Sequence, residues 1–76
     1  NFRNSRMRQL SGKELASILE HYGWELLRVH GSHHIYGKRG SKFRISIPIH
    51  GNTPLKRGLL KHLLELAGLK ESDLSF

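Results

Sequence analysis

Between Ser11 and Gly23, apolar residues recur every three or four positions, which is the spacing of one face of an α-helix. The apolar positions are Leu15, Ile18, Leu19 and Tyr22. Ser11 and Glu14 have the spacing of a capping box, in which each side chain bonds the backbone N–H of the other residue. Gly23 is typical of the residue that follows a helix. The pattern predicts a helix that starts after Ser11 and ends before Gly23.

The middle of the chain has the composition and the alternation of β-strands. Residues 24–30 and 33–37 are rich in strand-forming residues and are separated by Gly31 and Ser32. After a second turn at residues 38–41, apolar and polar residues alternate, which predicts a half-buried strand with one apolar face. The apolar positions of this third strand are Phe43, Ile45, Ile47 and Ile49. Pro48 indicates that the strand lies at an edge of the sheet or ends there.

A second helix is predicted from Thr53 as its N-cap and Pro54 as its first residue. Its apolar positions, expected in the core, are Leu55, Leu59, Leu60, Leu63, Leu64, Leu66 and Ala67. Gly68 ends it, and the tail that follows contains a further helical turn beginning at Ser72.

The predicted order of elements is α-β-β-β-α, an α+β fold. A three-stranded antiparallel sheet with both helices on one face buries the apolar positions and leaves the other face open. The functional residues are expected on that open face. The chain length of 76 residues allows one domain. Residues 1–6 are polar and without pattern, so we expect an expression remnant there and a single domain over residues 7–76.

The chain is strongly basic, which narrows its class of partner. Thirteen Lys and Arg residues against six Asp and Glu give a net charge of +7, with six further histidines. Such a field attracts polyanions, so the charge favours a nucleic acid partner, although a strongly acidic protein would also satisfy it. The chain has no cysteine, which excludes disulfides and thiolate zinc sites. It also lacks an apolar run long enough to span a membrane, so we expect a cytoplasmic protein without a membrane partner.

Four short motifs follow one another in a distinctive order. They are Gly-Trp at residues 23–24, Gly-Ser-His at 31–33, Ile-Pro-Ile-His-Gly-Asn at 47–52 and Leu-Lys-Arg-Gly-Leu-Leu at 55–60. With this order and spacing the chain resembles the HicA-type (YcfA-like) toxins from about Leu10 to Leu69. The resemblance implies the fold of double-stranded-RNA-binding domains, cleavage of mRNA and silencing by a HicB antitoxin. It also implies that the catalytic histidine is His33.

The chemistry of RNA cleavage agrees with that assignment. RNA carries its own nucleophile in the 2′-hydroxyl, so a cleaving protein chiefly needs proton transfer, which histidine performs near neutral pH, and stabilisation of the phosphate charge. Gly31 permits a tight turn before His33, and Ser32 lies within the same motif. The alternative is that His33 is simply a polar residue of a strand. His34 points to the opposite side and is expected to pack.

Two further histidines are candidates to assist His33. His30 and His50 lie on neighbouring strands, and His50 is the better candidate to assist His33. The histidines do not have the spacing of a metal-binding motif, so we expect no metal ion and no other cofactor.

Basic residues form two groups that are predicted to contact RNA phosphates. One group surrounds the second hairpin turn and contains Lys38, Arg39, Lys42 and Arg44; the other, on the last helix, contains Lys56, Arg57 and Lys61. The second group does not follow the Lys-Lys-x-Ala-Lys pattern of duplex-RNA-binding domains. Tyr36 is a candidate for stacking on a base, whereas Trp24 is expected to pack in the core.

Together with the resemblance, these features predict that the chain is the toxin of a toxin–antitoxin system. We expect it to be a metal-independent endoribonuclease that cleaves mRNA with a single catalytic histidine. Two other functions remain open: a non-catalytic RNA-binding module, and an interaction domain whose positive face docks an acidic partner. An acidic HicB-like antitoxin is expected to cover His33, because the field that attracts RNA also attracts an acidic inhibitor.

Overall fold

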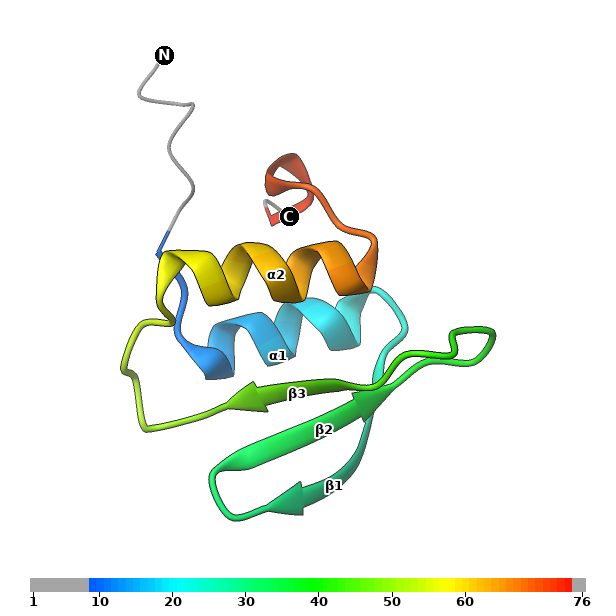
Figure 1. The fold of residues 1–76 in the computed structure, drawn as a ribbon, viewed down its shortest axis with the longest axis horizontal. Coiled ribbons are helices and arrows are strands. Elements are labelled where there is room, and N and C mark those ends of the chain that lie inside the picture. Colours follow the sequence, from blue (N-terminus) through cyan, green and yellow to red (C-terminus); the bar gives the residue numbers. More distant parts are fainter. Residues whose placement is uncertain (1–8, 75–76) are drawn as a thin grey trace.

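The order of secondary-structure elements is the predicted α-β-β-β-α (Figure 1). The computed structural model describes residues 9–74, so the prediction for residues 1–6 and Met7 lies outside the described residues. The elements are α1 (Gly12–His21), β1 (Glu25–His30), β2 (His33–Gly37), β3 (Ile45–Pro48), α2 (Arg57–Ala67) and a short 3-10 helix, η1 (Glu71–Leu74). The predicted α+β class is confirmed.

The first helix begins and ends as its sequence indicates. The Ser11 hydroxyl accepts a hydrogen bond from the Glu14 N–H at 3.2 Å, and the Glu14 carboxylate accepts one from the Ser11 N–H at 2.9 Å. This capping box satisfies two N–H groups that the first turn of a helix leaves unpaired. Gly23, with φ 96°, takes the left-handed conformation that ends α1, and its N–H bonds the Glu20 carbonyl.

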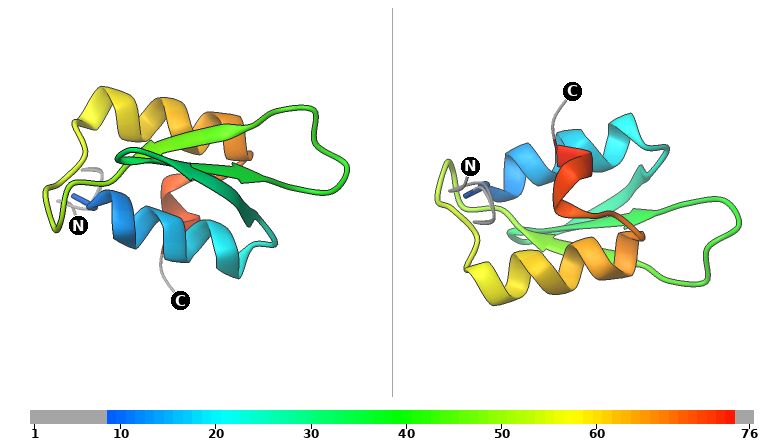
Figure 2. Two further views of the ribbon diagram at one scale, coloured as in Figure 1. Left: turned by 90° about the horizontal axis from the view of Figure 1, so that it is seen from below. Right: turned by 90° about the horizontal axis from the view of Figure 1, so that it is seen from above.

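The sheet has the order β1-β2-β3, and both pairs of strands are antiparallel. Tyr36 pairs with Ile45 and His34 with Ile47, and the burial of Tyr36, Ile45 and Ile47 identifies the face that the helices cover. The views from below and above show α1 and α2 running in the same direction along the sheet (Figure 2). His33 alternates with His34 along β2, so it belongs to the open face.

The core lies between the helices and the covered face of the sheet. Its buried apolar residues are Leu10, Leu15, Ala16, Ile18, Leu19, Trp24, Tyr36, Ile45, Ile47, Leu60, Leu63, Leu64 and Leu74. Trp24 is buried, as predicted, and its indole N–H has no hydrogen-bond partner among the described residues. Leu74 brings η1 into the core, and the Tyr22 hydroxyl donates a hydrogen bond to the Asp73 carbonyl at 2.8 Å. The predicted turn in the tail therefore exists and begins at Glu71, one residue before Ser72.

The predicted start of the second helix is wrong. The helix α2 begins at Arg57, with Lys56 as its N-cap and no capping side chain among the described residues. Residues 53–55 lie outside the helix, because Pro54 forms a β-bridge with Ser11 and the Leu55 N–H bonds the Leu10 carbonyl at 2.7 Å. The segment that resembles a helix start by its sequence therefore fastens the chain to the beginning of α1.

Two apolar residues that were expected in the core are exposed. Strand β3 begins at Ile45, and Phe43 lies in the preceding loop with 57% of its surface accessible. Leu59 on α2 is 37% exposed, because the buried stripe of that helix consists of Leu60, Leu63 and Leu64. Within residues 9–74, every helix is too short or too polar to cross a lipid bilayer.

Candidate functional site

The turn between β1 and β2 presents His33 on the open face. His30 and His33 form the last pair of the two strands, and only Gly31 and Ser32 lie between them. Gly31 has φ 65°, as the first central residue of a type II′ hairpin turn requires. The Ile49 N–H bonds the Ser32 carbonyl at 2.8 Å, so the chain that leaves β3 supports the turn. His33 thus stands at a fixed corner of the sheet.

The imidazole of His33 is exposed and is oriented by β3. Its Nδ1 lies 3.2 Å from the Ser46 hydroxyl, with which it forms a hydrogen bond whose direction depends on the tautomer. Ser46 on β3 pairs with Ile35, which is two residues after His33 on β2, so Ser46 lies on the open face diagonally opposite His33. The bond engages Nδ1 and leaves Nε2 for another partner. A histidine held in this way can exchange a proton through Nε2.

The other histidines lie around this corner in different ways. His30 is exposed directly opposite His33 across the turn, whereas His50 is exposed one residue beyond Ile49. His34 is half-buried on the helix side, where it pairs with Ile47, as its predicted packing role requires. Among residues 9–74, no group of three or more His, Asp or Glu side chains is placed to hold a metal ion.

The structure separates the predicted basic groups. Strand β3 ends beside His33, and the loop that follows leads to Lys56 and Arg57, so these cations lie at the His33 end of the molecule, with Lys61 one turn along α2 (Figure 1). The loop with Lys38, Arg39 and Lys42 projects at the other end of the sheet.

Arg44 lies on the open face at the loop end of the sheet, beside Gly37 at the end of β2. One of its guanidinium nitrogens lies 3.5 Å from the point where a Cβ of Gly37 would stand. Arg28, which the sequence reasoning missed, pairs with Ile35 and is exposed on the same face. Two guanidinium groups therefore accompany His33 on the open face.

Tyr36 does not belong to the RNA-contacting set. It is 2% exposed, and its hydroxyl donates a hydrogen bond to the Glu20 carboxylate at 3.1 Å. Burial, together with the hydrogen bond to the Glu20 carboxylate and its negative charge, raises the pKa of Tyr36 to about 12. The ring is part of the core, so it can neither stack on a base nor exchange a proton near neutral pH. We therefore correct the prediction for this residue.

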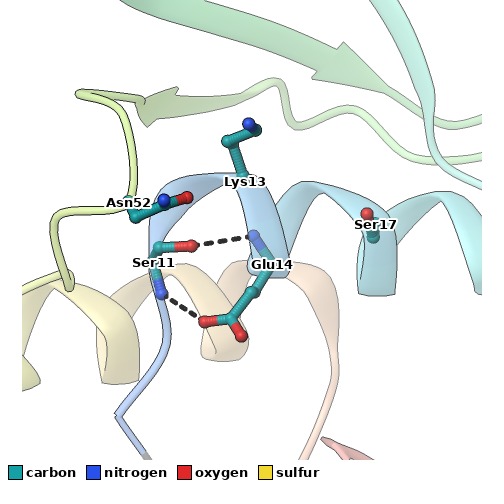
Figure 3. A pocket seen from close by; sticks show the side chains of 5 residues that line it. All are labelled: Ser11, Lys13, Glu14, Ser17 and Asn52. Atoms are coloured by element: carbon teal, nitrogen blue, oxygen red, sulfur yellow. Dashed lines mark hydrogen bonds between the residues drawn. The ribbon is translucent and has the colours of Figure 1, made fainter.

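A polar hollow of about 390 Å³ at the start of α1 is a second possible site (Figure 3). Its lining residues are Ser11, Lys13, Glu14, Ser17 and Asn52. Ser11 and Glu14 bond each other's backbone, so their side chains are used in capping the helix. Two of the five lining side chains are therefore already engaged in the helix cap.

The comparison with known families adds one finding. Residues 12–69 match the family described as the HicA toxin of bacterial toxin–antitoxin systems. This range includes the turn with His33, all three strands and α2. No curated protein matches the chain.

Proposed function

Because the chain belongs to the HicA family of bacterial toxins, we propose that it is an endoribonuclease that cleaves mRNA with His33. The observation that supports this most is the exposed imidazole on the open face, which Ser46 orients by a hydrogen bond to Nδ1.

In the proposed reaction His33 acts as general acid or base. It takes a proton from the attacking 2′-hydroxyl or gives one to the leaving oxygen of the phosphodiester, and such proton transfer accounts for about 10²- to 10⁴-fold in rate. Cations then stabilise the charge that develops on the phosphate. We assign this role to Arg28, which is opposite Ile35 on the open face, two residues along β2 from His33. Arg44 beside Gly37, and Lys56 and Arg57 at the start of α2, are assigned to more distant phosphates of the same RNA.

The residues around His33 support it in two ways. Gly31 and Ser32 form the turn that fixes its position, and the Ser32 carbonyl anchors the segment before His50. A second imidazole for the opposite proton transfer is available from His50, as the sequence suggests, or from His30 across the turn.

Cleavage is expected to persist in EDTA. The proposed reaction takes its nucleophile from RNA and its proton transfer from His33, so it needs no metal-bound water. Incubating the purified chain with a long mRNA, with and without the chelator, should give rates within about twofold of each other. If chelation stops the reaction and one divalent ion restores it, the mechanism is wrong and His30, His33 and His50 become candidate ligands. If RNA is bound but never cut, the chain is a non-catalytic RNA-binding module.

The family implies an antitoxin partner, and we propose that an acidic HicB-like protein covers His33 directly. The net charge of the chain is +7, and the open face also carries an exposed apolar side chain of β1, Leu27, which lies against Gly37. Opposite charges at the rim of an interface speed association, and apolar contacts slow release. Inhibitor and RNA should therefore compete for the same surface.

Hydrogen exchange on the complex with the antitoxin tests this arrangement. We expect slower amide exchange at residues 31–36 and at the start of α2, together with loss of RNA binding. Protection limited to the outward surfaces of the two helices, with His33 still accessible, would show that the antitoxin acts from a distance.

A further inference from the structure

The loop between β2 and β3 forms one wall of an open hollow of about 630 Å³. The loop projects at the end of the sheet remote from His33 (Figure 1). One wall is the loop itself, residues 38–43, and the others are Trp24 and the end of α2 at residues 65–68. We call this space the hairpin hollow. No function has been assigned to the hollow so far, although the cations of the loop are expected to contact RNA phosphates.

The hairpin hollow combines three cations with an exposed aromatic ring. Lys38, Arg39 and Lys42 line it, and so does Phe43, which is 57% exposed. Exposure of a phenyl ring to water is unfavourable. Positive charge around a free aromatic ring is the combination by which proteins hold unpaired nucleotides, the cations at the phosphate and the ring on the base.

The loop holds these groups in place. The Ser41 N–H bonds the Lys38 carbonyl at 3.0 Å, and the Ser41 hydroxyl accepts a hydrogen bond from the Phe43 N–H at 3.2 Å. The Lys38 ammonium lies 5.9 Å from the centre of the Trp24 ring. Glu65 also lines the hollow, so a phosphate is favoured on the side of the loop. The two hydrogen bonds of Ser41 therefore hold the loop in the conformation that exposes the Phe43 ring.

We propose that the hairpin hollow binds one unpaired nucleotide of RNA, with its base stacked on Phe43 and its phosphate held by Lys38, Arg39 and Lys42. The identity of the ligand as RNA rests on the proposed function. An acidic peptide would need the cations and would leave Phe43 without a flat partner, so a nucleotide fits both features better.

The position of the hollow gives it a distinct role. Strand β2 leads from His33 to Gly37, about 13 Å at the usual rise per residue, and the hollow begins at Lys38. RNA bound at both ends would pass Arg28 and Arg44 on the open face and then bend around the loop between β2 and β3 to reach the hollow on the side of α2. The hollow would therefore hold the strand several nucleotides away from the bond that is cut, and it would select single-stranded RNA.

The test uses the full chain with His33→Ala, so that RNA stays intact during a titration. Trp24 is the only tryptophan and lines the hollow, so its fluorescence reports binding there. A single-stranded RNA of about eight nucleotides is the probe, and anisotropy of a labelled copy gives the affinity. Adding Phe43→Ala should weaken binding by about 5- to 100-fold and abolish the change in fluorescence, whereas Phe43→Tyr should restore both.

Leu59→Ala is the matched control, because it truncates an exposed apolar side chain on α2 outside the hollow. It should leave the affinity within about twofold. Lys42→Ala should lower the salt dependence of binding by about one counterion, whereas Phe43→Ala should leave the salt dependence unchanged.

Unchanged RNA affinity in the Phe43→Ala variant would overturn the inference, as would equal dependence on Phe43 for duplex RNA. Loss of affinity for the acidic antitoxin alone would also overturn it and would assign the hollow to a protein partner. Since every measurement is made without His33, a failure here leaves the proposed cleavage standing. Absence of cleavage in the parent chain would in turn leave this binding result valid.

Discussion

Replacing His33 by alanine is expected to lower the rate of RNA cleavage by about 10²- to 10⁴-fold, the contribution typical of general acid–base catalysis. The side chain is exposed and bonds only Ser46 among the contacts that the structure gives it, so its removal should leave the core intact. Cleavage of a long mRNA, followed over time, gives the rate. Circular dichroism and thermal unfolding on the same samples give the state of the fold.

His62→Ala is the appropriate control for this substitution. His62 is also an exposed histidine, but it lies on α2 rather than on the open face of the sheet. The control should cleave at the parental rate. A folded His33→Ala protein that still cleaves would remove His33 from the mechanism, and an unfolded one would indicate a structural role instead.

Gly12→Ala is expected to destabilise the fold by about 1–3 kcal/mol, although alanine is the better residue in a helix. A Cβ at Gly12 would collide with the Pro48 carbonyl oxygen and lie 3.2 Å from the Ile49 Cα and 2.9 Å from its Cγ1. The backbone atoms cannot move aside without separating α1 from the end of β3. Urea or thermal unfolding measures the loss.

Gly58→Ala is the matched comparison, because it makes the same change in the first turn of the other helix. A Cβ at Gly58 would have no neighbouring atom within 4 Å, so the intrinsic preference for alanine should act alone. The expected result is a gain of up to about 1 kcal/mol. If both variants gained stability equally, the close packing of α1 against β3 would be contradicted.

Much of the fold could be predicted from local signals in the sequence. The capping box at Ser11 and the glycine at position 23 are interactions within a few residues, and the structure reproduces both. Thr53 and Pro54 misled for the same reason. They carry the local signature of a helix start, but a long-range bridge to Ser11 and a bond to Leu10 hold them outside the helix.

The candidate site was harder to predict than the fold, because contacts between strands bring its residues together. The motif at residues 31–33 pointed to His33, but its hydrogen-bond partner, Ser46, is thirteen residues away and becomes its neighbour only through the register of β2 and β3. Tyr36 and Phe43 show the limit of predicting contacts with RNA from the sequence. Both are aromatic residues near basic ones, and only the packing of α1 and α2 decides that Tyr36 is buried and Phe43 exposed.

The bulge in β1 has a consequence for the behaviour of the chain at high concentration. All six residues of this strand are exposed, and the pairing with β2 shifts register between Leu26 and Arg28. An apolar edge strand of this kind is a template for cross-β stacking between molecules, and a bulge with flanking charges interrupts the flat backbone that such stacking requires. We therefore expect the irregularity to disfavour pairing of β1 with the edge strand of another molecule when no partner covers that edge.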